Sequence, residues 1–101
     1  MASRLSLQTM LEELLGSRNV YYQPPASVYM QYPAIVYSRR RVENVHADNA
    51  IYNQNTSYEV IVIDEDPDSE IVAKVTQLPM CSHDRHYTAD DLNHDVFTLY
   101  F

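Results

Sequence analysis

Glycine, tryptophan and cysteine are the scarce residues of this chain. Its 101 residues include one glycine, one cysteine and no tryptophan. A single glycine, where average usage gives about seven, excludes the glycine-rich loops that cradle phosphates or dinucleotides. A single cysteine excludes an intrachain disulfide and is typical of a chain that folds in a reducing compartment.

Long apolar runs and basic residues are also lacking. No apolar run approaches the roughly 18 residues of a membrane span, and Gln8, Glu12 and Glu13 interrupt the stretch that a secretory signal would keep apolar. Seven basic residues stand against fourteen acidic ones, for a formal charge of −7. Because tight nucleic-acid binding neutralises phosphates with Lys and Arg, we expect no sequence-specific DNA binding and no membrane partner.

The charge is divided unevenly along the chain. Residues 1–58 hold five basic and four acidic side chains, a net +1, whereas residues 59–101 hold two basic and ten acidic ones, a net −8. Such complementary halves suit head-to-tail contacts between copies, which join two different faces of the same molecule. The nine tyrosines point the same way, because tyrosine is enriched at protein interfaces.

Length and composition predict one ordered domain over residues 1–101. Hydrophobic residues make up 46 % and charged residues 21 %, which is typical of a globular chain. The core of so short a chain is small, so neighbouring copies could add stability.

The amino-terminal segment has the spacing of an amphipathic helix that ends at Gly16. Its apolar stripe is Leu7, Met10, Leu11, Leu14 and Leu15. Residues 17–33 then form a connector, because Pro24, Pro25 and Pro33 do not fit a helix interior. Several tyrosines in this connector predict that it lies on the domain or on a neighbour.

The rest of the chain predicts four strands and a second helix. Strands at 34–42 and 57–63 enclose polar residues 43–56, interpreted as a long hairpin tip or an extended loop. The second helix has Asp66 as its cap and Pro67 as its first residue, spans about three turns, and ends before Pro79. Two more strands, 80–88 and 94–101, flank a turn at 89–93. The predicted fold class is α+β, in the order α-β-β-α-β-β: a mainly antiparallel sheet of about four strands with two helices packed on one face.

Two clusters could carry chemistry. Cys81, His83 and His86 include zinc-ligand types and a potential nucleophile, but strand alternation puts His86 on the opposite face unless the strand bulges. The acids from Asp64 to Asp68 lack the glycine of a calcium loop and suit a strand end followed by a helix start. We expect no catalytic residue, no metal and no cofactor, and therefore no enzyme.

The basic run Arg39-Arg40-Arg41 is open to three interpretations. It could be a solvated strand end, a set of salt bridges to the acidic half of a neighbouring copy, or a phosphate contact. On a regular strand Arg40 points away from the face of Arg39 and Arg41.

Several short segments, in this order, resemble the tail terminator, or tail-to-head joining, proteins of long-tailed phages. They are Tyr32-Pro33-Ala34-Ile35-Val36-Tyr37, Tyr58-Glu59-Val60 through Ile63-Asp64, Asp66-Pro67-Asp68-Ser69, Leu78-Pro79-x-Cys81, Asp90-Asp91-Leu92-Asn93-His94 and Phe97-Thr98-Leu99-Tyr100-Phe101. The resemblance covers most of residues 30–101.

The resemblance implies a virion protein of the tail or neck that is assembled in the host cytoplasm. Such a protein forms a homo-hexameric ring on the last ring of tail tube protein, stops tube growth, and joins the tail to the head connector while DNA passes through the lumen. The alternative within the same machinery is a head-completion or stopper protein. A binding module of another pathway and a small metal-dependent enzyme are the remaining hypotheses.

The predicted interface residues come from the basic run, the polar excursion and the tyrosine-rich connector. They are Arg39, Arg40, Arg41, Glu43, Asp48, Asn49, Tyr52, Asn53, Tyr21, Tyr22 and Tyr29.

Overall fold

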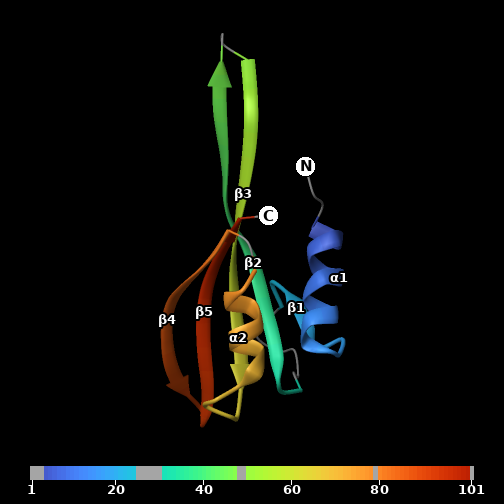
Figure 1. Ribbon diagram of the computed structural model, residues 1–101, viewed down its shortest axis with the longest axis vertical. Helices are drawn as coiled ribbons and strands as arrows, with labels where there is room; N and C mark the ends of the chain where they lie inside the picture. The colour runs from blue at the N-terminus through green and yellow to red at the C-terminus, as the bar shows by residue number, and fades with distance from the viewer. Residues whose placement is uncertain (1–3, 25–30, 48–49, 79, 101) are drawn as a thin grey trace.

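The computed structural model describes residues 4–24, 31–47, 50–78 and 80–100, with side chains described outside residues 41–55. A five-stranded sheet carries two helices (Figure 1). The elements are α1 (Arg4–Leu15), β1 (Val20–Tyr22), β2 (Ala34–Ala47), β3 (Ala50–Asp64), α2 (Glu70–Thr76), β4 (Cys81–Ala89) and β5 (Leu92–Tyr100). The strand order is β1-β2-β3-β5-β4, and every neighbouring pair is antiparallel except β1 and β2.

The α+β class is confirmed, but the predicted count of about four strands is wrong because β1 was missed. The observed order is α-β-β-β-α-β-β. β1 has three residues, too few to show a strand pattern, and lies in the proline-containing connector. Its place is fixed by distant residues: Ile35 donates to the carbonyl of Asn19 at 2.9 Å, and Gln23 donates to the carbonyl of Tyr37 at 3.0 Å.

The first helix forms as its apolar stripe predicts. Leu7 and Leu11 are fully buried, and Met10, Leu14 and Leu15 pack against the same core. Gly16 follows the last helical residue with φ +80°, and its N–H donates to the carbonyl of Glu12 at 2.9 Å. This left-handed residue ends the helix as expected.

The second helix is shorter and starts later than predicted. Its cap is Ser69, whose hydroxyl accepts from the Ile71 N–H, and it has seven residues. The carboxylate of Asp66, the predicted cap, accepts from the Asp68 N–H at 2.9 Å, and that of Asp64 accepts from the Asp66 N–H at 3.0 Å. The Asp66 bond is the one that an N-cap makes, but the chain continues as a turn and the helix begins at Glu70.

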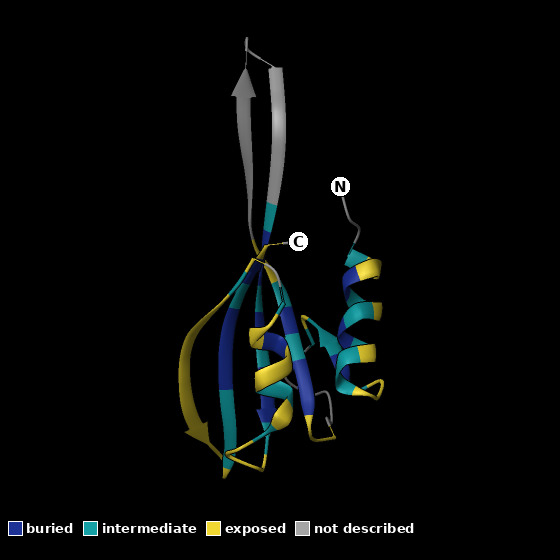
Figure 2. Cartoon of the chain, in the orientation of Figure 1, coloured by how far each residue is buried: buried dark blue, intermediate teal, exposed yellow. Residues whose placement is uncertain are grey.

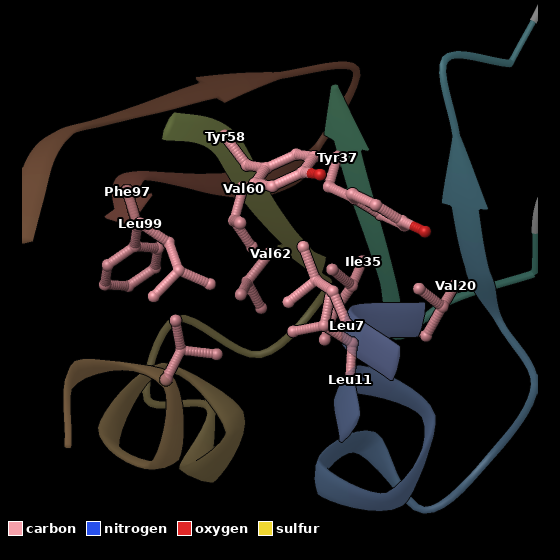
Figure 3. Close-up of a cluster of buried hydrophobic side chains, with 11 residues drawn as sticks. Leu7, Leu11, Val20, Ile35, Tyr37, Tyr58, Val60, Val62, Phe97 and Leu99 are labelled. Atoms are coloured by element: carbon pink, nitrogen blue, oxygen red, sulfur yellow. The ribbon is translucent and has the colours of Figure 1, made fainter. Parts of the chain in front are cut away.

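The core lies between the helices and one face of the sheet. Alternate residues of β2, β3 and β5, together with Val20 of β1, point toward α1 and α2, whose Leu7, Leu11 and Val75 complete the cluster (Figure 3). The residues of β2, β3 and β5 are Ile35, Tyr37, Tyr58, Val60, Val62, Phe97 and Leu99. Buried residues concentrate in this layer, and β4 is exposed along nearly its whole length (Figure 2).

The hairpin interpretation of the polar excursion is confirmed, and the hairpin is long. β5 pairs with β3 from Ser57 to Asp64, whereas the β2–β3 ladder continues outward to the Ala47–Ala50 pair. Residues 41–47 and 50–56 therefore form a two-stranded ribbon, here called the arm, which projects from the sheet (Figure 1). It gives the molecule its 51 Å long axis against 25 and 23 Å across.

The predicted turn between the last two strands is present but tighter. Asp90 and Asp91 connect β4 to β5 with φ values of 53° and 62°. Two consecutive positive φ values are the mark of a two-residue hairpin turn whose twist matches that of the strands.

Candidate interaction surfaces

The root of the arm carries two exposed arginines on opposite faces of the sheet. Arg39 pairs with Tyr58, which points into the core, and Arg41 pairs with Ser57, so Arg40 is an extra residue in the ladder. The Arg40 Nη1 donates to the Thr98 Oγ1 at 2.9 Å, on the face away from the helices. The predicted opposition of Arg39 and Arg40 is therefore confirmed. The predicted alignment of Arg41 with Arg39 stays a prediction, because the Arg41 side chain lies outside the described set.

Neither of these arginines has a carboxylate partner within the described part of the chain. The ion pairs there join His83 to Asp95 and Arg85 to Asp84. Arg40 meets a neutral hydroxyl, which orients the guanidinium without neutralising it. The arm root therefore presents positive charge on a chain of strongly negative net charge.

Acidic side chains gather at the opposite end of the sheet. The Asn93 amide donates to the carbonyls of Asp64 and Glu65, at 3.4 and 3.3 Å, and so ties the β3–α2 connection to the β4–β5 hairpin. That end holds the acids of both connections and lies away from the arm (Figure 1). They are Asp64, Glu65, Asp66, Asp68, Glu70, Asp90 and Asp91. The charge split along the sequence thus becomes a separation in space.

The two described tyrosines of the predicted interface have different surroundings. Tyr22 packs against Tyr37 with ring centroids 4.9 Å apart and lies under the Arg4 guanidinium at 4.4 Å, so its ring is used inside the molecule. Tyr21 pairs with Val36, and alternation therefore puts it on the face away from the helices. Both are half-buried.

The remaining predicted interface residues belong to the arm or lie outside the described residues. Glu43 pairs with Asn55, Asn53 pairs with Val45, and Tyr52 lies beside a register shift. The side chains of these arm residues and of Arg41 are outside the described set, as are Tyr29, Asp48 and Asn49. Their contacts stay predictions.

A hydrogen-bond network that the sequence did not reveal holds α1 to the sheet. The Tyr37 hydroxyl donates to the Gln8 Oε1 and accepts from the Arg4 Nη1 at 3.3 Å. The Gln8 amide in turn donates to the Val20 carbonyl at 3.0 Å. Burial raises the pKa of Tyr37 above its ordinary value, so the phenol stays protonated and keeps donating.

The cysteine and histidine cluster is placed differently from the alternation argument. A register shift between His83 and Arg85 marks a bulge at Asp84, and His86 consequently pairs with Asp95 on the face that Cys81 and His83 share. The strand thus has the bulge named above as the exception to His86 facing the other way. Even so, no group of three metal-ligand side chains close enough to hold an ion is present among the described residues.

The side chain of His83 in this cluster contacts residues of the neighbouring strand β5. The His83 Nε2 lies 3.2 Å from the Asp95 Oδ1, and its ring meets Phe97 edge-on at 5.2 Å. Burial raises the pKa of the Cys81 thiol, which disfavours the thiolate that a nucleophile or metal ligand needs.

Comparison with protein-family models and with curated proteins finds no match to this chain. Within the part that the structure describes, no helix has the length and apolar character required to cross a membrane.

Proposed function

We propose that this chain is a structural assembly protein, a phage tail terminator that acts as a homo-hexameric ring. In this role the ring sits on the end of the tail tube, stops tube growth, and joins the tail to the head connector. DNA passes through the lumen without sequence-specific binding, and the protein resides in the tail or neck of the virion. No catalytic step and no cofactor belong to this function.

The observation that carries the proposal is the arm. It extends well beyond the five-stranded sheet, and within the described backbone its two strands form a ladder with each other alone. An element of this kind is built to contact another molecule, because a two-stranded hairpin alone is at best marginally stable in water. We assign its tip to the tube protein and its root to contacts between copies.

The charge separation supports a ring. A head-to-tail contact joins two different faces of the same molecule, and here the arm root is positive while the far end of the sheet is acidic. We assign the basic root of one copy to a contact with acidic side chains of the next copy.

The proposal is tested with purified protein and purified tail tubes. Negative-stain electron microscopy and mass photometry are expected to show rings seated at one end of each tube and no protein along its side. A control variant with Lys74→Glu and Arg85→Glu, which lie in α2 and β4 and not in the arm, is expected to bind as well as the parent. Binding to heads and not to tube ends would favour the stopper alternative.

A further inference from the structure

The arm has two unpaired backbone edges. Within the described backbone, β2 pairs only with β3 beyond residue 37. Likewise, β3 pairs only with β2 outside residues 57–64. Half of the peptide groups in each strand of such a ribbon point outward. Those N–H and C=O groups form rows that match the edge of another strand.

The sequence of the arm does little to block edge pairing. Residues 41–56 contain no lysine and no proline, the residues with which natural edge strands are often protected. The edge strand β4 differs, because it carries the Asp84–Arg85 ion pair. Both edges contain a register shift, which in the arm lies between Val45 and His46 and has to be accommodated by the pairing. The sequence of the arm also lacks an alternating apolar pattern. We therefore do not expect the arm to be stabilised by packing one of its faces on a hydrophobic surface.

We propose that the arm pairs edge to edge with the arm of a second copy, the outer edge of β2 lying against the outer edge of β3 of the next. The inference rests on the proposed ring. Arms related by rotation about one axis point the same way, and β2 and β3 run in opposite directions within each. The new pairing is therefore antiparallel, like the ladder within the arm.

A ring is the arrangement that satisfies both edges. A two-fold dimer would pair one edge of each arm and leave the other exposed, whereas a closed ring pairs every edge and forms a small barrel with two strands from each copy. Barrel closure removes sheet edges altogether. Strands of closed barrels tilt by about 35–45°, so the proposed pairing requires the arms to be inclined to the ring axis.

Hydrogen–deuterium exchange of the intact protein tests the pairing. In dilute monomer, the outward amides of 41–47 and 50–56 are expected to exchange quickly while the inward ones are slower. In concentrated protein that mass photometry shows to be oligomeric, the outward amides are expected to slow by at least about tenfold, equivalent to about 1.4 kcal/mol. Oligomers whose outward amides exchange at the monomer rate overturn the proposal, and so does a protein that stays monomeric at about 1 mM.

A pair of substitutions at one position separates backbone pairing from side-chain contact. Of Gln54 and Asn55, the residue whose amide is outward in the dilute protein is changed to Pro and, separately, to Ala. Proline removes the outward N–H, so that variant is expected to stay monomeric, whereas the alanine variant keeps the N–H and assembles normally. Equal loss in both variants, or in neither, contradicts the proposal.

The exchange experiment and the tube-binding experiment can give different answers. If rings cap tube ends but the outward amides of their arms exchange at the monomer rate, the terminator function is retained and only the arm pairing is contradicted. Protected arms in a protein that never binds tube ends would remove the function and leave the pairing. The near-ultraviolet and far-ultraviolet circular dichroism of both variants is expected to match the parent, because the arm lies outside the core.

Discussion

The Arg40 guanidinium reaches across β3 and donates a hydrogen bond of 2.9 Å to the Thr98 hydroxyl on β5. The contact spans the point where the sheet narrows to the two-stranded arm. It orients one positive charge at the arm root, on the face opposite to Arg39. This placement is the basis of the first prediction.

Reversing both charges, with Arg39→Glu and Arg40→Glu, is expected to weaken ring assembly about tenfold. Exposed charge pairs contribute about 0.2–1 kcal/mol each, and two per interface approach the ~1.4 kcal/mol of a tenfold change. Sedimentation velocity over a concentration series measures the effect. The control is Lys74→Glu with Arg85→Glu, which changes the net charge equally. Identical assembly of the two double variants would contradict the charge account.

Salt provides an independent check of the same contact. Screening acts over about 8 Å at physiological ionic strength, so raising NaCl is expected to weaken assembly of the parent more than that of the Arg39→Glu, Arg40→Glu variant. Parallel salt curves for the two proteins would show that these arginines do not face acidic groups in the assembly.

The Tyr37 hydroxyl is predicted to matter for stability. Tyr37→Phe deprives the Gln8 Oε1 of its donor and the Arg4 guanidinium of its acceptor, so we expect a loss of about 1–2 kcal/mol. Urea unfolding of the monomer, with an unchanged m-value, measures it. Tyr22→Phe is the control, since its ring and the Arg4 contact remain. Equal stability of the two variants would show that the network contributes little.

Stability is expected to fall at alkaline pH. Burial raises the pKa values of Tyr37 and Cys81 above their ordinary 10.0 and 9.0, so the unfolded chain loses these protons first. The stabilisation is fully present below the ordinary values and is lost as pH rises through the raised ones. We expect the urea midpoint to fall above pH 9, with Cys81→Ser removing the earlier part and Tyr37→Phe the later part. A midpoint that is flat to pH 11 would contradict this account.

The helix end at Gly16 gives a further prediction. With φ +80° and no atom within 4 Å of a built Cβ, Gly16→Ala meets a purely conformational cost of about 1 kcal/mol. Gly16→Asn is expected to cost less, because asparagine tolerates the left-handed region better. Thermal unfolding of the three proteins ranks them. An alanine variant as stable as the parent would mean that the helix ends differently in solution.

Local signals predicted the elements that are determined locally. The stripe from Leu7 to Leu15 and the adjacent Gly16 define α1, and the polar excursion between two apolar runs defines the long hairpin. The helix start predicted from Asp66-Pro67 is wrong: Asp64 and Asp66 accept hydrogen bonds within local turns, and Ser69 caps the helix. The features that escaped prediction depend on distant partners.

Three-residue β1 illustrates this dependence, because it is a strand through its pairing with β2. The bulges at Arg40 and Asp84 depend equally on register between strands. For the candidate site, the sequence predicted the basic run and its opposing faces. It did not reveal the Thr98 contact or the Tyr37 network, whose partners lie 58 and up to 33 residues away.

The most direct test of the central claim is electron microscopy of particles from a phage in which this gene is inactivated. The account predicts overlong, uncapped tail tubes, with normal length restored when the parent gene is supplied in trans. Tails of normal length beside heads that leak DNA would contradict it and favour a stopper on the head side of the joint.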